Sequence, residues 1–187
     1  MGYAVELYFD RQMEQNIADL RHALEENGIP SMLDKSGDRP HISLAGFSNV
    51  DRDVLISLVQ EYAHGLEQFS VQLSAIGTFP TDENILFLSP VPTHQLLSYH
   101  QEFHQRLIKS KLVSSPYYVP ANWVPHCSVE IDIPGEKLPR AIELCAKAFK
   151  PIHGQFVGIG VIEFWPIKQV ASWPLVAKTH QRAINSS

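Results

Sequence analysis

The sequence is poor in cysteine and lacks long apolar runs. Its two cysteines, Cys127 and Cys145, are too few for a disulfide framework and are not spaced like zinc ligands. This usage predicts a reducing compartment, and the early acidic residue Glu6 argues against a secretory signal, so we expect a cytoplasmic protein. No segment reaches the roughly 18 consecutive apolar residues of a membrane-spanning helix, so we expect no membrane partner.

Positive charge is also scarce. The chain has 15 Lys and Arg against 20 Asp and Glu, a formal net charge of −5, and no long basic run. Proteins that coat long nucleic acids make many phosphate contacts through basic residues, so this balance argues against a partner such as duplex DNA. A nucleotide or an RNA end held in a local pocket is compatible with it.

What is present is the composition of an ordinary globular domain, with 44% apolar and 19% charged residues over 187 positions. No linker and no low-complexity segment is visible, so we expect one domain over residues 1–187. Apolar periodicity predicts strands mixed with helices, which favours an α+β fold with mostly antiparallel sheets. The expected strands are 3–9, 41–45, 69–76, 85–90, 124–133, 155–164 and 168–177, and the expected helices lie within 10–28, 51–66, 92–111 and 139–149.

One short pattern occurs twice. PHISL at 40–44 recurs as PHCSV at 125–129, with proline, histidine, one further residue, serine and an aliphatic residue in each. From the composition, two chance matches to Pro-His-x-Ser would occur in roughly one chain in a thousand. The histidines are 85 residues apart (126 − 41), and each motif is followed by a helix and more strand. We therefore expect two lobes that contribute one copy each.

Residues two apart in a strand point to the same side. His41 therefore shares a face with Ser43, and His126 shares one with Ser128. If the lobes face each other, two imidazoles and two hydroxyls converge on one cleft. Cleavage of a phosphodiester needs a base for the attacking oxygen and an acid for the leaving oxygen, and histidine, with a pKa of about 6.5, suits both tasks. Serine hydroxyls can donate to the non-bridging oxygens, and no metal or cofactor is required.

The paired motifs, their spacing and the segment PANWVPH (120–126) resemble the 2H phosphoesterase superfamily. GTFP (77–80) followed by LFLSP (86–90) is similar to the bacterial RNA 2′,3′-cyclic phosphodiesterase branch, long called 2′-5′ RNA ligases. The resemblance covers most of the chain. It implies a bilobal, pseudo-twofold fold with two mostly antiparallel sheets facing a central cleft and helices outside. It also implies that His41 and His126 are the acid–base pair and that Ser43 and Ser128 bind phosphate, without assigning the acid and the base.

The expected function is a metal-independent cyclic phosphodiesterase that opens the 2′,3′-cyclic phosphate of an RNA end or nucleotide. The resemblance implies a 2′-phosphate product, and ligation would be the reverse reaction. Three alternatives stay open: a 2′,5′-phosphodiesterase or a hydrolase of a small cyclic metabolite, a non-catalytic nucleotide-binding module, and an interaction protein with structural histidines. We expect a monomer.

Three aromatic residues beside the motifs are candidates for substrate binding. Phe47 follows the first motif, and Tyr117 and Trp123 precede the second. The rings of Tyr117 and Trp123 could stack on a nucleobase, with packing around the neighbouring prolines as the alternative. Phe47 could close the groove, with packing in the core as the alternative.

Two further groups of residues suggest chemistry but do not complete a site. His100 and His104 share a helix face, but Glu102 is one place late for the zinc protease motif and no third ligand is evident. We therefore predict no metal site. Cys127 is expected to face away from His126, which argues against a Cys–His nucleophile.

Overall fold

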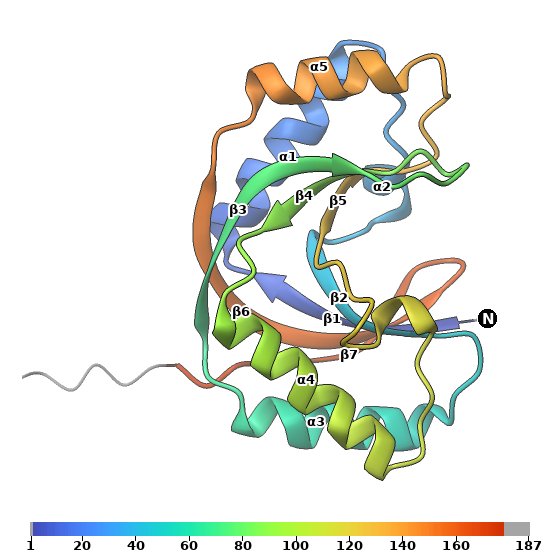
Figure 1. The fold of residues 1–187 in the computed structure, drawn as a ribbon, viewed down its shortest axis with the longest axis vertical. Helices are drawn as coiled ribbons and strands as arrows, with labels where there is room; N and C mark the ends of the chain where they lie inside the picture. The colour runs from blue at the N-terminus through green and yellow to red at the C-terminus, as the bar shows by residue number, and fades with distance from the viewer. Residues whose placement is uncertain (1, 178–187) are drawn as a thin grey trace, which may run out of the picture.

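The computed structural model describes residues 2–177 (Figure 1). Within this range the strands are β1 (Gly2–Phe9), β2 (His41–Phe47), β3 (Phe69–Thr78), β4 (Leu86–Pro90), β5 (Cys127–Glu130), β6 (Ile152–Phe164) and β7 (Lys168–Pro174). The helices are α1 (Arg11–Glu26), α2 (Met32–Ser36), α3 (Arg52–Gly65), α4 (His94–Lys109), α5 (Leu138–Ala148) and the 3-10 turn η1 (Pro116–Tyr118). The α+β prediction is confirmed.

Two local predictions were wrong in detail. The segment 31–40, for which the sequence predicted neither a strand nor a helix, contains the short helix α2. The strand expected from residue 124 begins only at Cys127, because Pro125 has no N–H to donate to a neighbouring strand. It also ends early, since Asp132 adopts a positive φ of 53° that is incompatible with a strand.

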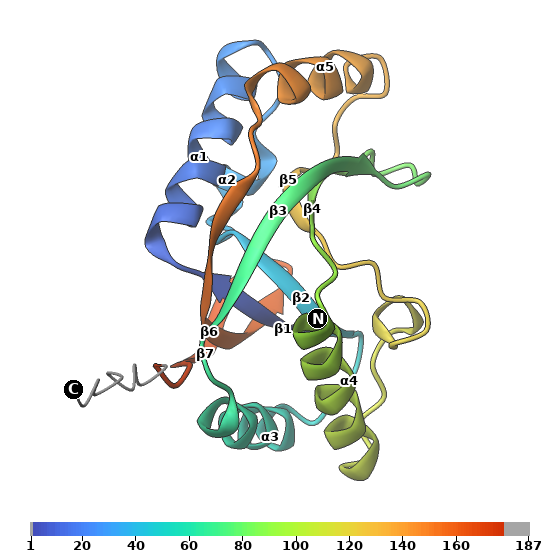
Figure 2. The ribbon, with the colours of Figure 1, turned by 60° about the vertical axis from the view of Figure 1, so that its left-hand side comes forward.

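The strands form one antiparallel sheet in the order β2-β1-β6-β3-β4-β5, with β7 added beside β6. The two expected sheets are therefore joined by hydrogen bonds. The junction is β6, whose 13 residues pair with β3 near its start and with β1 along the remainder. The sheet curves so strongly that its end strands, β2 and β5, come near each other (Figures 1 and 2). This curvature brings the two motifs together.

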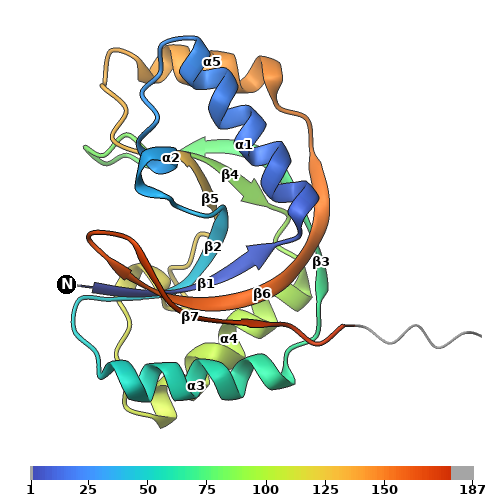
Figure 3. The same cartoon turned by 180° about the vertical axis from the view of Figure 1, so that it is seen from behind.

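The larger helices cover the outside of the curved sheet in two pairs. Figure 3 shows α1 with α5 at one end and α3 with α4 at the other. Asp10 caps α1 by accepting from the main-chain N–H of Gln12 and Met13, and Asp51 caps α3 in the same way. None of the described helices is long and apolar enough to cross a membrane.

Aromatic packing on β6 ties the sheet together. The buried ring of Phe156 lies 5.1 Å from that of Phe9 on β1 and 4.9 Å from that of Phe69 on β3, measured between ring centroids. We expect Phe156→Ala to lower the free energy of unfolding by about 3–5 kcal/mol, because it leaves a cavity at this junction. Urea denaturation measures the loss. Val113→Ala, at a position 83% exposed, is the control, expected within about 0.5 kcal/mol of the wild type. A loss below about 1 kcal/mol for Phe156→Ala would contradict the prediction.

Candidate active site

The two motif histidines make the same local hydrogen bond. Nδ1 of His41 lies 2.7 Å from the carbonyl oxygen of Arg39, and Nδ1 of His126 lies 2.7 Å from that of Val124. A carbonyl oxygen only accepts, so Nδ1 carries the proton in both rings. In each histidine Nε2 is therefore the nitrogen that can exchange a proton with a substrate.

A β-bulge follows the serine of the first motif. Ser43 pairs with Glu6 on β1 and Ala45 pairs with Val5, so Leu44 has no partner on that strand. Up to the bulge the expected alternation holds, with His41 and Ser43 half-buried and Ile42 fully buried. Beyond the bulge the alternation is reversed, because one extra residue has been inserted.

The second motif has a bulge at the equivalent place. Ser128 pairs with Phe87 on β4 and Glu130 pairs with Leu86, which leaves Val129 as the extra residue. The fifth residue of each motif is therefore the bulged one. The repeat seen in the sequence therefore extends to the pairing of the strands. Phe87 is the partner of Ser128 in one half, as Glu6 is the partner of Ser43 in the other.

A glycine lies on the third strand of each half. Glu6 pairs with Gly160 on β6, and Phe87 pairs with Gly77 on β3. A Cβ at Gly160 would collide with the Tyr8 ring, and one at Gly77 would collide with the Phe87 ring. Each glycine thus makes room for an aromatic ring on the neighbouring strand.

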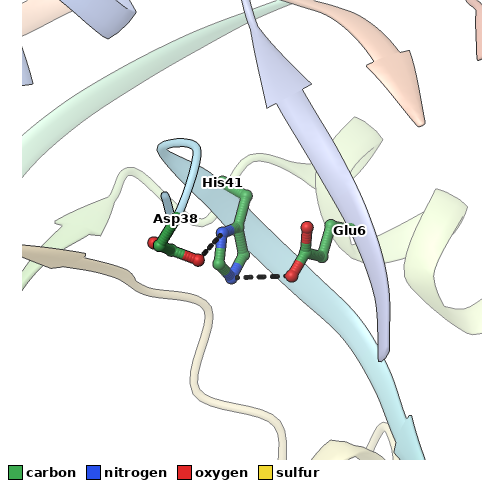
Figure 4. A group of neighbouring side chains, drawn as sticks. All are labelled: Glu6, Asp38 and His41. Atoms are coloured by element: carbon green, nitrogen blue, oxygen red, sulfur yellow. Dashed lines mark ion pairs between the residues drawn. The ribbon is translucent and has the colours of Figure 1, made fainter. Parts of the chain in front are cut away.

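His41 lies between two buried carboxylates. Its Nε2 is 3.3 Å from Oε1 of Glu6 and its Nδ1 is 3.5 Å from Oδ1 of Asp38 (Figure 4). Burial opposes a charge on the ring, but attraction to Glu6 and then to Asp38, aided by the Arg39 carbonyl, outweighs burial and the repulsion from Arg21. The pKa of His41 is therefore raised above its ordinary value.

The Tyr8 hydroxyl lies against Glu6. It is 3.0 Å from Oε2 of Glu6 and 3.0 Å from Oε1 of Gln169, and its one proton is shared between these two acceptors. The amide nitrogen of Gln169 donates to the carbonyls of Val161 and Ala171, which orients its oxygen toward Tyr8. Sequence reasoning missed Glu6 as a site residue; the available signal was a single acid within an apolar strand.

A buried arginine on α1 connects the two motifs. Arg21 forms an ion pair with Asp38 at 3.3 Å and donates to the carbonyl oxygen of Ser128 at 2.9 Å. It also contacts the half-exposed Asp34 at 3.4 Å. Asp38, which precedes the first motif, is therefore joined through one side chain to the main chain of the second. No local sequence pattern indicated this contact.

His126 lies among aromatic rings instead of carboxylates. Its ring centroid is 4.9 Å from that of Phe79 and 5.3 Å from that of Phe87. Burial lowers the pKa of His126, and the positive charge of His41 lowers it further, against an opposing effect of the Val124 carbonyl. The two histidines thus have the same tautomer, but their pKa values shift in opposite directions, because carboxylates flank His41 whereas His126 is buried among aromatic rings.

The three aromatic candidates lie in different surroundings. Phe47 is 2% exposed and belongs to the core, because the bulge reverses the face on which it lies; it offers no ring to a substrate. Trp123 is half-buried, with one face stacked on His100 at 3.6 Å between ring centroids and Nε1 donating to the Ser43 carbonyl at 3.0 Å. Tyr117 is 81% exposed on η1 and remains open to a ligand.

The second histidine pair binds main chain. Nε2 of His100 and Nε2 of His104 lie 3.2 and 3.1 Å from the same oxygen, the carbonyl of Leu44. Both Nε2 atoms must therefore carry protons. Burial lowers both pKa values, that of His100 to about 3, so both rings are neutral donors.

Within residues 2–177, one group of three side chains is close enough to hold a metal ion: Glu6, Asp38 and His41. Asp38 lies beside Nδ1 and Glu6 beside Nε2, at different edges of the ring (Figure 4). Nδ1 already donates to the Arg39 carbonyl, so only Nε2 could bind a cation. The arrangement suits retention of a proton on His41 better than shared coordination of one ion.

Solved structures share the fold of this curved sheet. Escherichia coli LigT in complex with 3′-AMP has a TM-score of 0.62 at 15% identity, over 92% of this chain and 97% of LigT. The Thermus thermophilus protein TT0787 has 0.65 at 12%, over 96% and 100%. Kluyveromyces marxianus Usb1 has 0.53 at 13%, over 94% and 97%. At these identities the likeness concerns the fold.

Sequence comparison identifies the family. The family model described as the 2′-5′ RNA ligase superfamily matches residues 9–164. The chain therefore belongs to that superfamily, the 2H phosphoesterases. No curated protein sequence matches the chain.

Proposed function

We propose that the chain is a metal-independent cyclic phosphodiesterase that opens the 2′,3′-cyclic phosphate of an RNA end or nucleotide. The observation that carries the proposal is the repeated motif itself, in which Nδ1 of each histidine is bound to a main-chain carbonyl, with carboxylates beside His41 and aromatic rings beside His126. Near neutral pH this pair offers one charged and one neutral imidazole, as in-line displacement at phosphorus requires.

The surroundings support a different role for each histidine in this proposal. His126 is the general base: its Nε2 takes a proton from the attacking water as the new P–O bond forms. His41 is the general acid: its Nε2 proton passes to the ribose oxygen as the old P–O bond breaks. The 3.3 Å contact of Nε2 with Glu6 is long for a charge-assisted hydrogen bond, which leaves this proton available to the leaving oxygen.

The serines complete the phosphate site in this proposal. Ser43 and Ser128 are half-buried beside the histidines, where their hydroxyls can donate to the non-bridging oxygens. The Ser43 side chain also bonds with Tyr118, and this bond opposes the rise in the Tyr118 pKa that burial causes. Exposed Tyr117 on the same turn is the aromatic residue available to a base. The 3′-AMP complex of LigT supports a nucleotide-like ligand, and two buried, unpaired cysteines fit the expected cytoplasmic location.

The direct test is incubation with nucleoside 2′,3′-cyclic phosphates in EDTA, with products separated by chromatography. We expect turnover to a 2′-phosphate at a rate unaffected by EDTA. Loss of turnover in EDTA with recovery on adding Mg²⁺ would contradict metal independence. A 2′,5′-linked dinucleotide is the second substrate, and cleavage of it alone would identify the 2′,5′-phosphodiesterase instead. Binding of both without turnover would identify a nucleotide-binding module.

A further inference from the structure

Side chains satisfy part of the outer edge of β2, while the Gly46 carbonyl accepts from the main-chain N–H of Ser115 at 2.7 Å. β2 is an end strand and pairs only with β1, so its other edge needs partners for its carbonyl groups. At the bulge two successive carbonyls accept hydrogen bonds from side chains outside the strand. Ser43 accepts from Nε1 of Trp123, and Leu44 accepts from His100 and His104 on α4. The strand that carries the first motif is thus held at its serine by Trp123, and at the next residue by His100 and His104.

His100 contacts both the Leu44 carbonyl and the Trp123 indole. Its imidazole is buried and lies flat on the Trp123 indole, with 6° between the ring planes and 3.6 Å between their centroids. His104 binds the same carbonyl as His100 but has a different ring neighbour: it lies against His100, at 4.6 Å. The indole is therefore located by both a stacking contact and a hydrogen bond.

Trp123 is three residues before His126, and little freedom separates them. Pro125 has a restricted φ, and the His126 ring is bound to the Val124 carbonyl. The main-chain N–H of Trp123 donates to the Val119 carbonyl at 2.9 Å, which closes the preceding turn. A shift of the indole along β2 would therefore move His126 relative to Ser43 of the other motif.

We propose that Trp123 and His100 are positioning residues that set the place of the His126 imidazole relative to the first motif, rather than contacts for a nucleobase. The proposal rests on the proposed function, because it concerns alignment of the base with the phosphate. Misplacement of a reacting group by about 1 Å can lower the rate about 100-fold.

Trp123 and His100 can hold His126 in place without gaining or losing a proton in the pH range of the proposed activity. The groups that face His100 are the His104 ring and the main-chain groups of Leu44 and Tyr118, with no carboxylate among the contacts that shift its pKa. Its low pKa, about 3, keeps the imidazole neutral while His41 and His126 change protonation. Variants of the pair should therefore change kcat without moving either limb of the pH profile.

Three variants test the proposal. Trp123→Phe keeps an aromatic ring against His100 but removes the N–H; His100→Gln keeps a donor for Leu44 but removes the flat ring. His104→Gln is the matched control, with the same acceptor and no stacking on the indole. We expect kcat to fall about 10- to 100-fold in the first two variants with KM within about threefold. We expect His104→Gln to stay within about threefold of the wild type, and a melting temperature close to that of His100→Gln.

Each other outcome overturns the proposal. A raised KM with kcat retained in Trp123→Phe would make the indole a substrate contact. An equal loss of kcat in His104→Gln and His100→Gln would make the effect one of fold stability. A readout independent of turnover is the NMR resonance of the His126 imidazole, expected to shift in Trp123→Phe and His100→Gln but not in His104→Gln. If the wild type lacks turnover, the proposed function fails, and this resonance still decides whether the pair positions His126.

Discussion

We expect alanine in place of His126 to lower kcat/KM for a 2′,3′-cyclic nucleotide by about 10²–10⁴-fold, the usual contribution of a general base, which is its proposed role. His41→Ala gives a loss of similar size, because the leaving oxygen then departs without a proton. The double variant loses much less than the product of the two, since the histidines act together in one step. The measurement is steady-state kinetics at neutral pH, with melting temperatures recorded for each variant.

The two variants should differ in stability. His126 is surrounded by Phe79 and Phe87, so its removal leaves no charge unpaired and the melting temperature stays close to that of the wild type. Removal of His41 leaves Glu6 and Asp38 with less positive charge nearby, which destabilises the fold at neutral pH. Kinetics of His41→Ala should therefore be measured well below its melting temperature.

An exposed histidine provides the activity control. His22 on α1 has a side chain 69% exposed, and within residues 2–177 its ion pair is with Glu26 on the same helix. His22→Ala should keep full activity. The paired acid–base mechanism is wrong if His41→Ala or His126→Ala keeps activity near that of His22→Ala.

Glu6→Gln shifts the alkaline limb of the pH profile to lower pH. His41 must be protonated to act as the acid, and Glu6 is the largest of the contacts that raise its pKa. Without that carboxylate the pKa of His41 falls, although Asp38 still raises it and Arg21 still lowers it. Above the pKa the protonated fraction falls about tenfold per pH unit, so activity is lost at alkaline pH and kept below neutrality. The measurement is kcat/KM as a function of pH.

Phe87→Glu should act on the opposite limb. It places a carboxylate beside His126 at the position that corresponds to Glu6, and so raises the pKa of His126. His126 must be neutral to act as the base, so the acidic limb moves to higher pH and activity falls below neutrality. Phe87→Gln is the matched control, since it adds polarity without charge and should leave that limb in place.

These profiles can contradict the assignment of roles in two ways. An alkaline limb that does not move in Glu6→Gln would show that His41 is not the acid. An acidic limb that moves equally in Phe87→Glu and Phe87→Gln would show that packing, and not charge, governs His126.

Local sequence signals predicted most of the helices and strands, and the repeated motif could be read directly from the sequence. Asp10 and Asp51 begin helices because the side chain that caps them is adjacent in sequence. Phe47 was misjudged for a nonlocal reason: in an uninterrupted strand it would share a face with His41, but the bulge at Leu44 reverses the alternation. Nothing within the motif indicates a bulge, which depends on pairing with β1.

The groups that distinguish the two histidines were also beyond sequence reasoning. Glu6 is 35 residues from His41 in sequence (41 − 6) and becomes its neighbour through the register of β1 against β2. Arg21 reaches the Ser128 carbonyl from a helix 107 residues away. Such contacts depend on how the sheet curves, which periodicity does not report.

The placement of Glu6 and Asp38 beside His41, with Phe79 and Phe87 beside His126, has a consequence for the regiochemistry of the proposed reaction. Two identical halves would treat a ribose cyclic phosphate alike in either of two orientations and release a mixture of isomers. In the proposed mechanism the carboxylates on one side give the site a polarity, because the bond that breaks would face His41 and the water would approach from His126. The choice between a 2′- and a 3′-phosphate product would then depend on which ribose oxygen lies toward His41 on β2, so that Glu6 and Asp38 would together give the reaction its direction.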